Sequence, residues 1–187
     1  MKPTTSADFD RAYRQPITFW GDVRIPKEVT ELSRRGAPRR VLELGCGVGR
    51  FTRYMAKQGL RATGVDFSPV AIEKAKARVA GDESKPDFLV GDVTHLEALR
   101  DPFDIAFDVG CFHCLDREGQ RGYVAELNRL LVPGGALLIW ALDDSPSDLR
   151  LSPAVMKATF APSFDLESAE SSRRRLAASH WYWLVRR

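Results

Sequence analysis

The sequence predicts an α/β fold with a parallel sheet, and three observations support this class. Short apolar runs alternate with segments of helical spacing, a pattern typical of parallel strands joined by crossover helices. A glycine-rich turn separates the first strand-like run from the helical segment that follows it, and ligands often bind at such a turn. The chain has 187 residues and is 44% hydrophobic, which suits one domain around a single core.

The first two strand and helix units repeat each other. Residues 39–44 read RRVLEL and predict a buried strand, and residues 50–58 predict a helix that stops at Gly59. Residues 61–66 read RATGVD and predict the second strand. Ser68 and Pro69 then suit the N-cap and first position of a helix that continues to Val79.

Three more strands are predicted in the middle of the chain. Residues 87–91, DFLVG, end near an aspartate, and residues 104–109, DIAFDV, form an apolar run of the kind that parallel sheets bury. A helix over residues 116–131 follows, with its leucines on one face. A Pro-Gly-Gly turn at residues 133–135 then leads into a fifth strand, ALLIWAL.

The tail of the chain predicts a different arrangement. A loop and a short helix occupy residues 143–160, and two strands begin with FDLES at residue 164 and HWYWLVRR at residue 180. The connection between them is too short for another crossover helix, so we expect an antiparallel pair.

The first 36 residues are expected to cover an apolar surface. They include a predicted helix from Pro26 to Arg35, preceded by an aromatic-rich segment with Phe9, Tyr13, Phe19 and Trp20. Such a segment either caps the edge of the sheet or lies over the ligand cleft as a lid.

Composition narrows the class of partner. The chain has 28 Lys and Arg against 25 Asp and Glu, and a net charge of +3 is too weak to indicate nucleic acid. No run approaches the roughly 18 apolar residues of a membrane helix, and the first residues lack the apolar core of a secretory signal. We expect a cytoplasmic protein, monomeric or homodimeric, without a membrane or nucleic-acid partner.

The three cysteines are expected to be reduced thiols. Their number is odd and the chain carries no secretory signal, so a disulfide framework is not expected. Cys111 and Cys114 form one C-x-x-C pair, but a second pair that would complete a four-ligand zinc site is missing. We therefore expect no metal.

The sharpest functional signal is the segment E-L-G-C-G-V-G at residues 43–49. Glycines at a turn between strand and helix let the backbone approach a ligand closely. Asp66 ends the second strand, twenty-one residues after Gly45, where a carboxylate can accept hydrogen bonds from both ribose hydroxyls. The ligand is therefore expected to contain a ribose.

The glycine spacing argues against a nicotinamide dinucleotide. That fingerprint is G-x-G-x-x-G, whereas the glycines here read G-x-G-x-G. Glu43 before the first glycine and Asp92 after the third strand add carboxylates that a pyrophosphate does not need. A ligand with an ammonium group and an adenine uses them, because Glu43 supports the turn and Asp92 accepts from the adenine amino group.

The segments E-L-G-C-G-V-G, G-V-D-F-S, G-D-V and L-V-P-G-G-A-L-L resemble the successive motifs of class I S-adenosylmethionine-dependent methyltransferases over residues 39–141. The resemblance implies a Rossmann-like three-layer sandwich. Its sheet would have seven strands in the order 3-2-1-4-5-7-6, with strand 7 antiparallel. We accordingly expect a single domain, 1–187, with a helical cap or lid at 1–36, a cofactor-binding core at 37–141 and a helix and strand hairpin at 142–187.

The same resemblance implies a site for S-adenosylmethionine, which becomes S-adenosylhomocysteine. The expected cofactor-binding residues are Glu43, Gly45, Cys46, Gly47, Asp66, Phe67, Asp92, Val93 and Asp108, with Trp20 and Arg24 over the methionine end. Gly45 and Gly47 would border the methionine part, Asp66 the ribose, and Asp92 and Val93 the adenine.

The methyl acceptor is expected to be a small molecule. The segment D-V-G-C-F-H at residues 108–113 resembles the D-x-G-x-F-H sequence of small-molecule methyltransferases that act on thiols, tellurium or selenium species, heterocyclic nitrogens or hydroxyls. His113 is the candidate catalytic base, although a packing role explains it equally well. Tyr13, His113 and Trp140 are candidates for the acceptor pocket.

Other functions stay open at this point. The tetrapeptide of DNA amino-methylating enzymes is replaced by Asp-Val-Gly-Cys after the fourth strand, which disfavours a nucleic-acid acceptor. Two alternatives to a small-molecule methyltransferase are a non-catalytic module that binds S-adenosylmethionine and a nicotinamide-dependent oxidoreductase.

Overall fold

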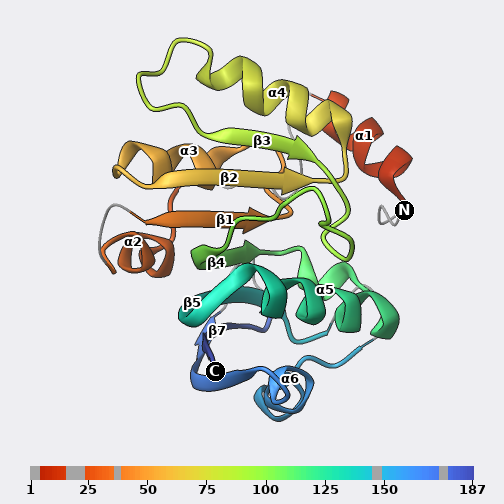
Figure 1. Cartoon of the computed structure of the whole chain (residues 1–187). Helices are drawn as coiled ribbons and strands as arrows, with labels where there is room; N and C mark the ends of the chain where they lie inside the picture. Colours follow the sequence, from red (N-terminus) through yellow and green to blue (C-terminus); the bar gives the residue numbers. More distant parts are fainter. Residues whose placement is uncertain (1–4, 16–23, 36–38, 145–148, 173–176) are drawn as a thin grey trace. The chain divides into compact units, whose positions relative to one another are not determined.

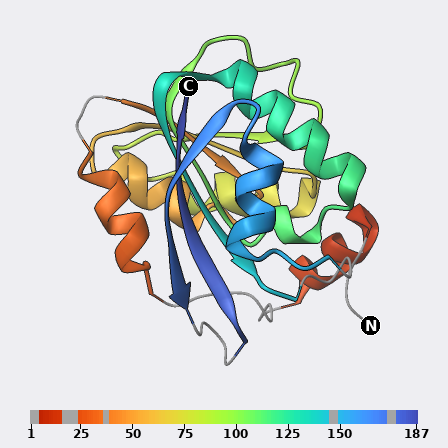
Figure 2. The same ribbon diagram turned by 90° about the horizontal axis from the view of Figure 1, so that it is seen from below.

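A computed structural model describes residues 5–15, 24–35, 39–144, 149–172 and 177–187 (Figures 1 and 2). The chain forms two compact units, residues 1–92 and 93–187. The first unit contains α1 (Ser6–Arg14), α2 (Lys27–Ser33), β1 (Arg40–Leu44), α3 (Arg50–Lys57), β2 (Arg61–Asp66), α4 (Pro69–Val79) and β3 (Asp87–Val90). The second contains β4 (Phe103–Val109), η1 (Phe112–Cys114), α5 (Arg117–Leu130), β5 (Leu131–Leu142), α6 (Pro153–Phe160), β6 (Phe164–Ser172) and β7 (Ser179–Arg186).

The first unit is built from the two repeated strand and helix units that the sequence predicts. β1 pairs in parallel with β2, and β2 pairs in parallel with β3. α3 packs on β1 and β2, while α4 packs on β2 and β3. α3 ends before Gly59, whose φ of 87° suits glycine, and the Ser68 hydroxyl caps α4 by accepting the Ala71 N–H at 3.1 Å. Local turn chemistry therefore sets both helix boundaries.

Residues 6–14 of the aromatic-rich N-terminal segment form a helix, α1, that was not predicted from the sequence. α1 begins with a capping box in which Thr5 and Asp8 each accept the other's backbone N–H. It lies beside α4 (Figure 1). Phe19 and Trp20 lie outside the described residues. The helix predicted at Pro26–Arg35 is present as α2.

The second unit contains the antiparallel hairpin that the tail predicts. β4 and β5 are parallel, whereas β7 runs antiparallel to both β5 and β6. Figure 2 shows β6 and β7 side by side with α6 next to them. The apolar face of α5 is buried, including Tyr123, Leu127 and Leu130. β6 continues to Ser172, so the connection to β7 is shorter than the sequence suggested.

The seven strands have the order β3-β2-β1-β4-β5-β7-β6. This order and the antiparallel β7 confirm the expected topology. One boundary differs, because β5 begins at Leu131 and includes the Pro-Gly-Gly segment predicted as a turn. The β4–β5 register shifts there, with Phe103 opposite Leu131 but Ile105 opposite Ala136, so the turn residues are accommodated as an irregularity at the start of the strand.

Candidate functional site

The glycine loop between β1 and α3 adopts the backbone conformation that its sequence predicts. Gly45, Gly47 and Gly49 have φ values of 68°, 52° and 74°, a region that side chains other than glycine rarely adopt. Space is also restricted, since a Cβ on Gly47 would lie 2.8 Å from the Tyr13 hydroxyl oxygen. A Cβ on Gly49 would lie 2.5 Å from the Phe88 ring. Gly47 therefore lies against Tyr13, and a larger residue at this position would clash with the tyrosine hydroxyl.

Glu43 stabilises this loop through contacts with the helix that follows it. Its buried carboxylate accepts the Thr52 backbone N–H at 2.6 Å and also the Thr52 hydroxyl. Thr52 lies in the first turn of α3, where a negative charge interacts favourably with the helix dipole. Glu43 therefore connects the end of β1 to the first turn of α3, and its predicted part in ligand binding stays a prediction. Thr52 itself was not identified from the sequence, because no motif marks it as the partner.

Asp66 joins the two loops that follow β1 and β2. Its Oδ2 accepts the Gly47 N–H at 2.8 Å, and its Oδ1 accepts the Ser68 N–H at 2.9 Å. Burial raises the pKa of this carboxyl, and the two backbone N–H groups partly oppose that shift. Each carboxylate oxygen can accept a second hydrogen bond. Asp66 therefore fits a ligand that presents two adjacent hydroxyls, as a ribose does.

Cys46 and Phe67 lie beside these polar groups. Burial, followed by the negative charges of Glu43 and Asp66, raises the pKa of the Cys46 thiol well above its ordinary value. A neutral thiol in this environment is unreactive. Phe67 is 38% exposed. Its ring makes an edge-to-face contact with the ring of Phe9, with the two centroids 5.1 Å apart. Phe67 thus presents an exposed aromatic surface next to Asp66.

The other residues predicted to bind the cofactor differ in exposure. Asp92 is exposed and Val93 is buried. The Gly91 N–H donates to the Asp66 carbonyl at 3.0 Å, which holds the chain after β3 against the end of β2. Arg24 is exposed, whereas Trp20 lies outside the described residues. Their predicted contacts with a ligand stay predictions.

Asp108 organises the loop that follows β4. Its buried carboxylate accepts three backbone N–H groups, from Gly110 at 2.8 Å and from Cys111 and Phe112 at 2.7 Å each. It also accepts the Tyr123 hydroxyl at 3.0 Å. These four bonds fill the acceptor positions of a carboxylate, so this geometry favours a loop-shaping role over the predicted cofactor contact. Burial raises the pKa of Asp108 to about 6, against the lowering effect of its donors.

His113 is held within the same loop. Burial lowers its pKa to about 4, so the ring is neutral near pH 7. Its Nδ1 accepts the Leu142 N–H at 3.4 Å, which places the ring proton on Nε2. The Trp140 ring packs against it edge-on, with centroids 5.6 Å apart. A Cβ on Gly110 would meet both rings at 3.4 Å. His113 in this loop therefore packs against Trp140 of β5, and the predicted role of both residues in an acceptor pocket stays a prediction.

The remaining polar candidates lie elsewhere. Among the residues that the structure describes, no three His, Cys, Asp or Glu side chains are grouped to hold a metal ion. His180 in β7 contacts the residue after β5 and a residue of β6, because its Nδ1 lies 2.6 Å from Asp143 Oδ1 and its Nε2 lies 3.2 Å from the Ser171 hydroxyl. Over the described ranges, no helix combines the length and apolar character needed to cross a membrane.

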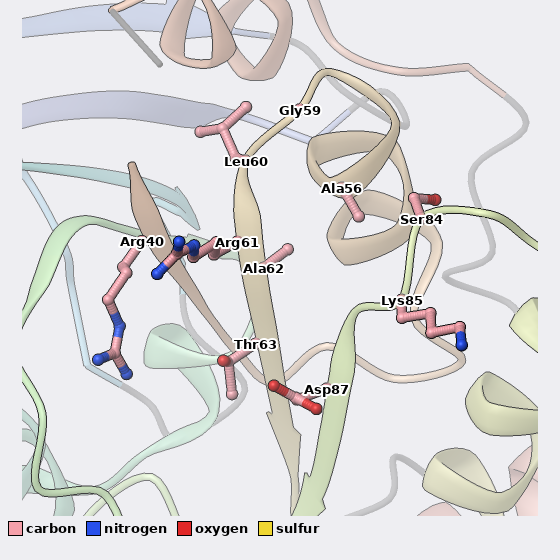
Figure 3. A pocket seen from close by; sticks show the side chains of 10 residues that line it. All are labelled: Arg40, Ala56, Gly59, Leu60, Arg61, Ala62, Thr63, Ser84, Lys85 and Asp87. Carbon is pink, nitrogen blue, oxygen red and sulfur yellow. The ribbon is translucent and has the colours of Figure 1, made fainter. Parts of the chain in front are cut away.

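A pocket of about 380 Å³ lies in the first unit, at the opposite end of the strands from the glycine loop (Figure 3). Its lining includes the first residues of three strands, Arg40, Arg61 and Asp87. In Figure 3 the side chains of Arg40 and Arg61 extend to one side of β2 and that of Lys85 extends to the other. None of the predicted site residues lines this pocket.

Comparison with known proteins identifies the class. The model of the methyltransferase domain family matches residues 41–135. An uncharacterised methyltransferase of Schizosaccharomyces pombe is 30% identical over 105 residues, which cover 56% of this chain and 72% of that protein. The chain therefore belongs to the methyltransferase domain family, and the predicted methyltransferase is confirmed.

Solved structures show the same fold. The N-methyltransferase NodS from Bradyrhizobium japonicum, in complex with S-adenosylhomocysteine, matches with a TM-score of 0.81 and 19% identity, covering 98% of this chain and 99% of NodS. The 1,6-didemethyltoxoflavin-N1-methyltransferase from Burkholderia thailandensis matches with a TM-score of 0.81 and 22% identity, covering 97% of this chain and 86% of that protein. The Rossmann-like topology of the class I methyltransferases is thereby confirmed.

Proposed function

We propose that the protein uses S-adenosylmethionine to methylate a nitrogen, oxygen or sulfur atom of a small molecule. The observation that carries this proposal is the position of Asp66 beside the glycine loop, where each carboxylate oxygen accepts one backbone N–H and keeps acceptor capacity for a ribose. When bound, the sulfonium donor supplies an electrophilic methyl group. The protein's task is to position the donor and the acceptor and to exclude water.

Residues between Glu43 and Val93 would hold the donor. In this proposal Gly45 and Gly47 border the methionine part, Asp66 binds the ribose, and Asp92 and Val93 border the adenine. Glu43 stabilises the glycine loop through its two bonds from Thr52, and the exposed ring of Phe67 packs on the adenine. Cys46 contributes a neutral, buried thiol that shapes the loop without reacting.

The acceptor-binding residues are proposed to be Tyr13, His113 and Trp140. With its pKa lowered to about 4, His113 is a weak base but a neutral hydrogen-bonding group. Its proton on Nε2 can hold an acceptor oxygen or nitrogen in line for transfer. This supports a positioning role for His113, and it suits acceptors that lose their proton without strong assistance. The small heteroaromatic acceptor in the name of the Burkholderia enzyme is consistent with this reading.

Calorimetric titration with S-adenosylhomocysteine tests the proposal, with a nicotinamide dinucleotide as the control ligand. We expect binding of the former at micromolar concentration and none of the latter. Binding of the dinucleotide alone would instead favour an oxidoreductase. A panel of thiols, amines and phenols with labelled donor then tests transfer, and donor binding without transfer to any of them would favour a non-catalytic binding module.

A further inference from the structure

Two polar contacts hold α1 against the second strand and helix unit. The Ser68 hydroxyl donates to Asp10 Oδ1, and the Lys74 ammonium donates to the backbone carbonyl of Tyr13. Both partners on α1 are therefore held by residues about sixty positions away in the sequence. The docking surface is formed by the start and the middle of α4.

α1 depends on this docking for its order. It has nine residues, whereas isolated helices shorter than roughly 12 to 15 residues are marginal in water. The capping box satisfies its N-terminus, but the carbonyls of its last turn need partners from elsewhere. Lys74 supplies one of these partners by donating to the Tyr13 carbonyl, and a cation at a helix C-terminus is also favourable.

The docked helix is connected to the glycine loop by a closed chain of contacts. Ser68, which binds Asp10, donates its own backbone N–H to Asp66 at 2.9 Å. Asp66 in turn accepts the Gly47 N–H at 2.8 Å. Gly47 lies against the hydroxyl end of the Tyr13 side chain, because a Cβ there would be 2.8 Å from the hydroxyl oxygen. Tyr13 is 6% exposed, so it covers the loop closely.

We propose that Lys74 and Asp10 are positioning residues that latch α1 in place, so that Tyr13 covers the glycine loop and slows release of the donor and of its product. The inference rests on the proposed function, because the covered loop is where S-adenosylmethionine is proposed to bind. Both residues act through Tyr13. The latch makes donor retention depend on a helix that precedes the cofactor-binding core.

Considered only as a charge, Asp10 would be expected to weaken ligand binding rather than to strengthen it. The Asp10 carboxylate lies close enough to Asp66 to disfavour ionisation of that second carboxyl. Removing Asp10 would therefore favour the ionised Asp66 and leave ligand affinity equal or higher. Alanine is also a better helix former than aspartate. A loss of ligand retention in Asp10→Ala would thus come from the lost latch.

The test compares the dissociation rate of S-adenosylhomocysteine from Lys74→Met and Asp10→Ala with that from the wild type. The matched control is Lys76→Met, which makes the same change at an exposed position of the same helix. Each latch variant is expected to release the ligand at least about fivefold faster, and the control should stay within about twofold of the wild type. Lys74→Arg should restore slow release, because it keeps a cationic donor.

Hydrogen–deuterium exchange of residues 5–15 gives a readout that needs no ligand. We expect faster exchange in both latch variants and unchanged exchange in the control. Equal dissociation rates in all variants would refute the latch while leaving the proposed function intact. Failure of the wild type to bind S-adenosylhomocysteine would overturn the proposed function, and the latch with it.

Discussion

Replacing His113 by glutamine is expected to change how the free energy of unfolding depends on pH. The folded protein keeps this imidazole neutral, with its pKa lowered from 6.5 to about 4 by burial. The unfolded chain takes up the proton at the higher pH. The stability that the neutral ring provides is therefore present above pH 6.5 and is lost as the pH falls toward 4. At pH 5 the loss is about 2 kcal/mol.

Asp108 in the same loop has the opposite effect. Its pKa is raised from 3.8 to about 6, with burial as the main cause. The folded state therefore takes up this proton more readily than the unfolded chain, and stability rises as the pH falls through 6. Between pH 7.5 and pH 5 the gain is about 1.5 kcal/mol. In the wild type the two contributions largely cancel.

Urea denaturation at pH 7.5 and pH 5 separates the two contributions. From the higher to the lower pH, the free energy of unfolding of His113→Gln should rise by about 2 kcal/mol relative to the wild type. That of Asp108→Asn should fall by about 1.5 kcal/mol relative to the wild type. Both variants lose packing or hydrogen bonds at either pH, and this common loss cancels in the comparison. Parallel pH profiles for the variants and the wild type would show that neither group is perturbed by burial.

Three further predictions concern the ribose-binding carboxylate, a buried hydrogen bond and a pair of glycines with positive φ. Asp66→Asn should weaken S-adenosylhomocysteine binding at least about tenfold in calorimetry, because an amide cannot accept at both of its ends; unchanged affinity would remove Asp66 from the donor site. Tyr123→Phe should lower the free energy of unfolding in urea by about 1 to 2 kcal/mol, since a buried carboxylate loses one donor. Gly59→Ala should cost about 1 kcal/mol for its positive φ alone, because no atom lies within 4 Å of the new Cβ. In Gly49→Ala the new Cβ would lie 2.5 Å from the Phe88 ring. This variant should lose at least about 1 kcal/mol more of the free energy of unfolding than Gly59→Ala. Equal losses in the two variants would contradict the packing argument.

Local chemistry made much of the fold predictable. The glycine loop, the Ser68 cap and the strand that ends at Asp66 each depend on residues close together in sequence, and the structure has all three. The antiparallel tail was predictable because a short connection rules out a crossover helix. The resemblance to known methyltransferases supplied the strand order, which periodicity alone does not give.

The parts that sequence reasoning missed depend on contacts that no sequence motif marks. α1 is too short to be recognised by periodicity, and its docking depends on Lys74 from another helix. The role of Asp108 depends on three successive backbone N–H groups and on Tyr123. An aspartate that accepts hydrogen bonds from the turn after it carries no sequence motif to distinguish it from an aspartate that binds a ligand. Thr52 was overlooked for the same reason.

The shortness of β3 has a consequence for how the protein behaves in concentrated solution. This strand ends the β3-β2-β1 side of the sheet and has four residues, of which Leu89 and Val90 are 39% and 54% exposed. An unpaired strand with exposed apolar side chains is a template for adding a strand from another molecule. A stretch of four residues offers few free backbone groups for such pairing. Its brevity therefore limits strand addition at this edge of the sheet, and insertions that extended β3 would favour aggregation there.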